Sequence, residues 1–315
     1  MNTPRPTRIA LLLAALAILL GGCKEFNARR KVNEAAKLFE KGRFREAAAL
    51  YEEALQEAPE LEVAHFNAAL TYRQMFMQAQ SDPSVKDAEV KDLANKAADH
   101  MLAYLENHPD EGQVVALTTK LWIDSGQYQK AIDYWEARRA KEPKNSDILG
   151  VLASIHNQAG HWEKAVEYHH LQADLAPSVD SAASTLTDVG NILWARISDK
   201  EKPPTGLERL RLIDMGIATM QKADRLLQAA PEPVDRKQLE VRLKHKVDIS
   251  SLTAGFLNLR ATAHPAAWAR GVEEAAAQVQ RAAWKTINDR WKQLKSELDA
   301  EEQEAGDEGG SKNKR

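Results

Sequence analysis

Apolar side chains recur every three or four positions along most of the chain, among frequent Ala, Leu, Glu, Lys and Arg residues. This spacing gathers the apolar side chains on one face of an α-helix, whereas a half-buried strand requires apolar and polar residues to alternate. Alternating runs of Val, Ile and Thr are scarce. The pattern therefore predicts an all-α fold.

A period of 34 residues overlies this helical pattern. Four kinds of landmark keep this step: the prolines Pro109, Pro143 and Pro177, the glycines Gly126 and Gly160, the alanines Ala97, Ala131 and Ala165, and the aromatic residues Tyr128 and Trp162. We expect these glycines, together with Gly42, at turns between helices, because glycine ends a helix without a steric penalty. The prolines should follow the second helix of each pair, since proline cannot continue a helix.

These landmarks resemble those of tetratricopeptide repeats, which are helix–turn–helix units of this length. The resemblance implies an all-α, right-handed helical solenoid made of stacked helix pairs. Four units follow from the spacing, at residues 28–61, 62–111, 112–145 and 146–179, and a divergent fifth unit follows at residues 180–233.

Two of the units carry insertions. The second unit has 16 extra residues, which we place near Gln78–Lys91 around the helix-breaking triplet Ser81-Asp82-Pro83. In the fifth unit, Lys202-Pro203-Pro204-Thr205-Gly206 predicts a loop. Both insertions should lie at turns between paired helices, and hence along one edge of the solenoid.

Residues 234–300 are predicted to form further helices. An apolar stripe at helical spacing consists of Trp268, Val272, Ala276, Val279, Ala283, Ile287, Trp291, Leu294 and Leu298. The favoured interpretation is a C-terminal helical cap, because repeat arrays must cover their last exposed core. The alternative is a docking helix, or half of a coiled coil, offered to a partner. Residues 301–315 are rich in glycine and charge, and we expect a disordered tail.

The N-terminal residues read as an export signal. The apolar run Ile9–Leu20 follows Arg5 and Arg8, and it is too short to span a bilayer. Directly after it, Leu20-Gly21-Gly22-Cys23 resembles the lipobox of bacterial lipoproteins. The resemblance implies that residues 1–22 are a lipoprotein signal peptide and that Cys23 becomes the lipidated N-terminus. The alternative is an ordinary secretory signal, with Cys23 an accidental thiol.

The residues around Cys23 extend this interpretation. In the lipoprotein family an aspartate after the cysteine tends to hold the protein in the inner membrane, and here that position is Lys24. The resemblance thus implies a lipid-anchored protein of the cell envelope, in the outer membrane rather than the inner one. We expect the first helix near Arg29, so that a tether of about six extended residues would reach roughly 20 Å.

Charge argues against nucleic-acid partners. Removal of residues 1–22 takes away two arginines and no acidic residue, so the net charge changes from −3 to −5. Nucleic-acid binding requires a basic face. Because Cys23 is the only cysteine, an internal disulfide and a thiolate metal site are excluded.

Catalytic patterns are missing as well. Four of the nine histidines cluster in the fourth unit, at His156, His161, His169 and His170. Their positions at core and turn sites favour a structural role over metal binding. The chain contains no His-Glu-x-x-His, glycine-rich phosphate loop or Gly-x-Ser-x-Gly pattern. We therefore expect neither an enzyme nor a bound cofactor or metal.

The resemblance implies a concave groove, lined by the first helix of each pair, that binds a protein or peptide partner. The predicted lining is Phe66, Asn67, Leu70, Arg73, Lys120, Ile123, Asn157, Gln158, Asp188 and Asn191. Repeats that bind the carboxylate tails of heat-shock chaperones require lysine at the positions where this chain has Val32 and Phe66. That specific ligand is not supported.

The leading functional hypothesis is a membrane-anchored periplasmic lipoprotein scaffold that binds a protein partner. A second hypothesis is a pilotin-like assembly factor for a secretion or pilus secretin, since those proteins are also lipidated repeat proteins. A third is an enzyme or a carbohydrate-binding protein whose pocket is built by the two insertions.

Overall fold

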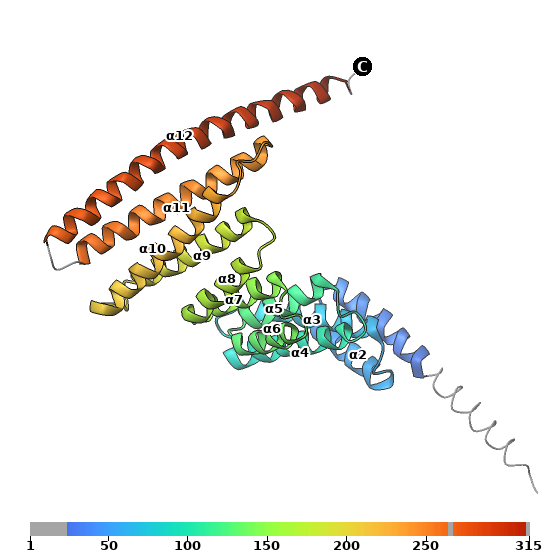
Figure 1. Cartoon of the computed structure of the whole chain (residues 1–315). Coiled ribbons are helices and arrows are strands. Elements are labelled where there is room, and N and C mark those ends of the chain that lie inside the picture. Colours follow the sequence, from blue (N-terminus) through green and yellow to red (C-terminus); the bar gives the residue numbers. More distant parts are fainter. Residues whose placement is uncertain (1–23, 264–266, 313–315) are drawn as a thin grey trace, which may run out of the picture. The chain divides into compact units, whose positions relative to one another are not determined.

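The computed structural model describes residues 24–263 and 267–312, and its regular elements over these ranges are all helices (Figure 1). The chain divides into two compact units, with the boundary between Ala131 and Ile132. The N-terminal unit holds a helix over residues 24–40, α2 (Phe44–Glu57), α3 (Glu62–Gln80), α4 (Asp87–Leu105), α5 (Gly112–Asp124) and the first turn of α6 (Tyr128–Lys141).

The C-terminal unit holds the rest of α6 and six further helices. These are α7 (Ser146–Gln158), α8 (Trp162–Asp174), α9 (Val179–Ile197), α10 (Gly206–Ala229), α11 (Arg236–Ala263) and α12 (Ala267–Lys312). Within each unit, helices adjacent in sequence pack against one another, as α3 does with α4 and α9 with α10. The predicted all-α fold of paired helices is confirmed.

Small residues allow the paired helices to approach closely. Ala47 and Ala97 in the N-terminal unit and Ala165 in the C-terminal unit have no exposed surface. In the first pair, Ala47 packs with Ala28 and Val32 of the preceding helix, and Tyr51 fills the adjacent space. The alanines that keep the 34-residue step therefore mark helix contacts.

Glycine ends the first helix at three of the turns. Gly42, Gly126 and Gly160 have φ angles of 72°, 72° and 80°, in the left-handed region. At each turn the N–H after the glycine donates to the carbonyl five residues earlier, as from Gln127 to Trp122 at 2.7 Å. This is the Schellman closure that glycine accommodates without strain. The predicted role of the three glycines is confirmed.

The insertion in the second pair lengthens its helices more than its turn. Helices α3 and α4 have 19 residues each, compared with 13 for α5 and 14 for α6. The turn between α3 and α4 covers only residues 81–86. Asp82 Oδ1 holds it by accepting hydrogen bonds from the amide and hydroxyl of Ser84, at 2.9 and 2.7 Å.

The core of the C-terminal unit lies between α9, α10 and α11. It includes Leu186, Leu193, Ile213, Met220 and Phe256, none of which is more than marginally exposed. Helix α11 packs against α9, α10 and α12. The helix pair predicted as a fifth unit is therefore not the last one, because α11 and α12 stack on it in the same manner.

Helix α12 runs antiparallel along α11 (Figure 1), as the ion pairs Arg236–Glu297 and Arg260–Glu273 require. Its Ala277 is fully buried and belongs to the core of the C-terminal unit. The predicted C-terminal helical cap is confirmed. Helix α12 thus covers apolar surface of the C-terminal unit.

The predicted stripe on α12 is partly wrong. Val272 and Val279 are 62% and 68% exposed. The inward face instead uses Ala277, Trp284 and Asn288, one position away in the helix. Alanines lie on both sides of this helix, so hydrophobic spacing alone could not choose between the two faces. The side chain of Trp268 lies outside the described residues.

Two predicted boundaries also need correction. The first helix is already formed at residue 24, with an ion pair between Arg29 and Glu25 at 2.8 Å, so the expected extended tether up to Arg29 is wrong. Helix α12 continues to Lys312, beyond the expected start of the tail at residue 301. Contacts of Arg236 with Glu301 and of Lys237 with Glu302 tie that extension to α11. Cys23 and the signal segment 1–22 lie outside the described residues.

No helix in the described part of the chain combines the length and apolar character that crossing a bilayer requires.

Candidate functional site

The predicted groove residues of the N-terminal unit lie on α3 and α5 and are mostly half-buried. On α3, Phe66, Asn67, Leu70 and Arg73 are all partly covered. The ring of Phe66 packs on Tyr104 of α4, with the ring centroids 5.2 Å apart, so part of its surface is used internally.

On α5, Lys120 is exposed and forms an ion pair with Asp124 at 2.9 Å, while Ile123 is half-buried. This unit therefore offers polar side chains but little open apolar surface along the predicted lining.

The four predicted groove residues of the C-terminal unit are all exposed. Asn157 and Gln158 lie at the end of α7, where Gln158 Nε2 donates to Ser154 Oγ at 3.2 Å. Asp188 and Asn191 lie one turn apart on α9. Residues three apart on a helix are neighbours on its surface, so Asp188 and Asn191 form one polar patch.

Neighbouring groups shift the pKa of the exposed Asp188. Desolvation by the neighbouring protein raises the pKa of this carboxyl, and the nearby His169 and His245 partly oppose the shift. Burial also lowers the pKa of His245 on α11.

Next to this patch, α9, α11 and α12 enclose a hollow of about 550 Å³, which we call the terminal hollow. Its lining comprises Asn191 and Trp194 of α9, Ser251, Leu252, Ala254, Gly255 and Asn258 of α11, and Arg281 and Trp284 of α12. Its volume lies in the range of pockets that hold small ligands.

A glycine on α11 makes room for one wall of the terminal hollow. A Cβ atom on Gly255 would come within 2.7 Å of the ring of Trp194, so the indole lies directly over this glycine. The same indole makes an edge-to-face contact with the buried Phe256, with centroids 5.5 Å apart. Trp194 therefore packs on Gly255 and Phe256 and also lines the hollow.

The mouth of the terminal hollow is polar. Asn191, Ser251 and Arg281 are exposed, whereas Trp194, Leu252 and Trp284 are half-buried. Arg281 Nη2 donates to Asn258 Oδ1 at 3.3 Å, and within the described ranges no carboxylate lies within ion-pairing distance of Arg281. The arrangement can take up an apolar group while amides and a guanidinium bind polar groups beside it.

Sequence reasoning found only one of these residues as a site residue, Asn191. Residues of α11 and α12 were missed because the repeat pattern fades after Pro233, so they could not be assigned to a groove-lining position. One usable signal was Gly255, because an isolated glycine within a helical pattern often marks close packing. Trp284 stands beside the predicted stripe, one position from Ala283.

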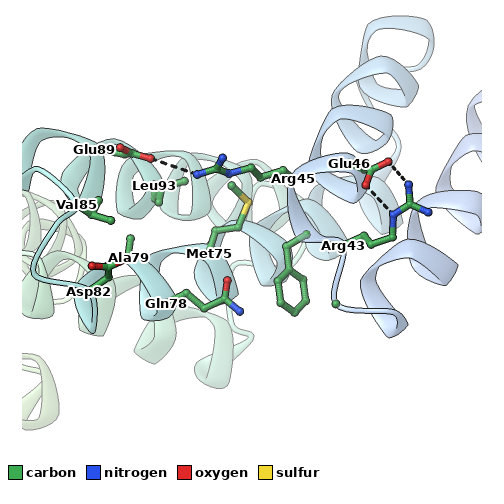
Figure 2. Close-up of a pocket in the computed structure, with 12 residues that line it drawn as sticks. Arg43, Arg45, Glu46, Met75, Gln78, Ala79, Asp82, Val85, Glu89 and Leu93 are labelled. Carbon is green, nitrogen blue, oxygen red and sulfur yellow. Dashed lines mark hydrogen bonds and ion pairs between the residues drawn. The ribbon is translucent and has the colours of Figure 1, made fainter.

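A second hollow, of about 430 Å³, lies in the N-terminal unit (Figure 2). It is bordered by the turn Gly42–Glu46, by the end of α3 and by the insertion with the start of α4. Its charged groups already have partners: Arg43 pairs with Glu46, and Arg45 approaches Glu89 at 3.9 Å. The first insertion thus contributes to a hollow, as the third functional hypothesis expects, but the lining shows no catalytic arrangement.

His156 and His169 of the fourth unit make contacts within that unit. His156 is buried and stacks on Tyr168 with ring centroids 5.4 Å apart, and burial lowers its pKa. His169 Nδ1 donates to Gln172 Oε1 at 3.0 Å. Across the described residues, no group of three or more His, Cys, Asp or Glu side chains could hold a metal ion.

Residues 148–183 match the family model of the tetratricopeptide repeat. They cover most of α7, all of α8 and the start of α9, and so include most of the fourth unit predicted at residues 146–179 and the first residues of the fifth. The resemblance to this repeat is confirmed there. No curated protein matches the chain.

Three solved structures illustrate the likeness to other proteins. A tetratricopeptide-repeat (TPR) protein from Bacteroides fragilis is 13% identical, with a TM-score of 0.39, over 80% of this chain and 98% of that one. YrrB, described as a TPR protein with an unusual peptide-binding site, is 15% identical, with a TM-score of 0.31, over 63% and 89%. PilW, described as a type IV pilus biogenesis factor, is 16% identical, with a TM-score of 0.31, over 64% and 94%. No function is transferred from likenesses this weak.

Proposed function

We propose that this protein is a lipid-anchored scaffold of the cell envelope, facing the periplasm, which binds an extended segment of a protein partner. The observation that carries the binding part is the polar surface of α9, Asp188 and Asn191, beside the terminal hollow. Such a surface combines the apolar site and the directed hydrogen bonds that peptide recognition requires.

The anchoring part rests on Cys23 and on the helix that follows it. The lipobox-like segment ends one residue before Lys24, where the first described helix is already formed. A lipid on Cys23 would therefore be joined to the folded chain with almost no flexible spacer. The absence of aspartate at position 24 supports the outer membrane as the destination.

Replacing Cys23 with serine is expected to release the protein from the membrane into the soluble periplasmic fraction. Stable anchoring needs more than one acyl chain, and all of these would be attached at this cysteine. Fractionation of cells followed by immunoblotting measures the outcome. Lys24→Ser is the matched control and should remain in the membrane, whereas persistence of the Cys23→Ser variant there would contradict lipidation.

A photo-crosslinking amino acid introduced at Asn157 or Asn191 is expected to capture a protein partner in intact cells. Both side chains are exposed on first helices of their pairs, where the proposed partner lies. Gln221, which is exposed on α10, the second helix of its pair, is the control and should give no adduct. Equal labelling from all three positions, or none from Asn157 and Asn191, would count against binding through this surface.

A further inference from the structure

The terminal hollow differs from the predicted groove of the N-terminal unit, which offers little open apolar surface, because much of its lining is apolar. Its apolar lining comprises the two indoles of Trp194 and Trp284, Leu252 and Ala254. Aromatic walls of this kind bind large apolar groups, because they provide much contact area with little conformational freedom to lose. The space is large enough for a bulky apolar side chain of a partner.

Two amide side chains stand beside this apolar lining. Asn191 comes from α9 and Asn258 from α11. An asparagine side chain has both a donor and an acceptor, so it can bind the C=O and N–H of one residue in an extended chain. An extended peptide lying across α9 and α11 would therefore find backbone partners next to the position of its apolar side chain.

Arg281 places a positive charge at the rim of the terminal hollow. Arg281 of α12 is exposed, and within the described part of the chain its side chain bonds to the neutral Asn258. A guanidinium binds a carboxylate with two parallel hydrogen bonds, which gives both affinity and direction. Asp188, one turn before Asn191 on α9, supplies the opposite charge nearby.

We propose that the terminal hollow binds a bulky apolar side chain of an extended peptide segment whose neighbouring acidic side chain pairs with Arg281. The inference rests on the proposed protein-binding function and gives it a ligand chemistry: an apolar residue next to an acidic one. It also gives α12 a role beyond covering the core, since Arg281 and Trp284 complete the site.

A selection from a random peptide library displayed on phage tests this proposal. The bait is the full-length protein in detergent, either unchanged or carrying Arg281→Glu. The unchanged protein should enrich peptides in which a large apolar residue adjoins aspartate or glutamate. The Arg281→Glu protein should enrich peptides with lysine or arginine at that place, because the charge at the rim is reversed.

Affinities are then measured by calorimetry with two synthetic peptides, acetylated and amidated at their ends. Both carry a central phenylalanine, followed by glutamate in one and by lysine in the other. Arg281→Glu should weaken binding of the glutamate peptide about tenfold and strengthen binding of the lysine peptide. Arg270→Glu makes the same change on an exposed residue of α12 outside the hollow, and should leave both affinities unchanged.

Peptides that bind equally well to the unchanged, Arg281→Glu and Trp284→Ala proteins would overturn the inference while leaving peptide binding elsewhere on the protein intact. Selection of apolar peptides without a charge preference would overturn the role of Arg281. If the unchanged protein selects no peptide at all, both this inference and the proposed binding function fail.

Discussion

Replacing Arg242 with methionine is expected to lower the free energy of unfolding of the C-terminal unit by about 3 kcal/mol. The Arg242 side chain on α11 is only 7% exposed and makes two hydrogen bonds of 2.6 Å to the carboxylate of Asp180, at the start of α9. It also donates to the carbonyl oxygen of Pro231 at 2.8 Å. Methionine would keep the apolar contacts but leave Asp180 without its cation.

Denaturant unfolding followed by tryptophan fluorescence measures this effect, because six of the seven tryptophans lie in the C-terminal unit. Arg236→Met is the matched control, since Arg236 pairs with Glu297 at 2.6 Å but both side chains are nearly half exposed. An exposed pair contributes less than about 1 kcal/mol. If the two variants lost the same free energy of unfolding, burial of the Arg242–Asp180 pair would add nothing to its contribution to stability.

Gly216→Ala is expected to destabilise the C-terminal unit by about 2 kcal/mol, although alanine is the better helix former. Gly216 is buried in α10, and a Cβ atom there would lie 2.5–2.7 Å from three atoms of the Phe256 ring. Phe256 has no exposed surface, so its ring has no free space into which to move. The overlap must displace either the ring or the helix.

Gly271→Ala on α12 provides the control, because nothing lies within 4 Å of a Cβ at that position. This change should stabilise the protein by about 1 kcal/mol through helix propensity alone. In a Phe256→Leu background the cost of Gly216→Ala should fall by at least half, because the atoms that clash are removed. An unchanged cost in that background would contradict the packing explanation.

Gly216 and Gly255 show why part of the structure was not readable from the sequence. Neither lies at a turn. The repeat pattern, which correctly predicted turns at Gly42, Gly126 and Gly160, therefore gives neither of them a role. Their roles depend on aromatic rings from other helices, Phe256 over Gly216 and Trp194 over Gly255. Such contacts depend on how helices cross, which local periodicity does not specify.

The candidate site likewise contains residues that the sequence predicts and residues that it does not. Asn191 was predicted because it follows the repeat pattern on α9, and the structure places it at the rim of the terminal hollow. Arg281 and Trp284 belong to α12, whose apolar stripe was assigned to the wrong face near Val272 and Val279. Because alanines lie on both sides of this helix, the hydrophobic pattern does not show which face is buried.

By itself, the sequence determined the all-helical fold, the 34-residue repeat, the glycine turns and the lipobox-like segment ending at Cys23. Those features are local, because helix spacing, turn geometry and cleavage signals depend on residues close together in the chain. Only the tertiary structure decided which face of α12 is buried, that Arg242 reaches Asp180, and that α9, α11 and α12 enclose the terminal hollow. Those features join residues up to about ninety positions apart, and their geometry is set by helix packing that no local pattern encodes.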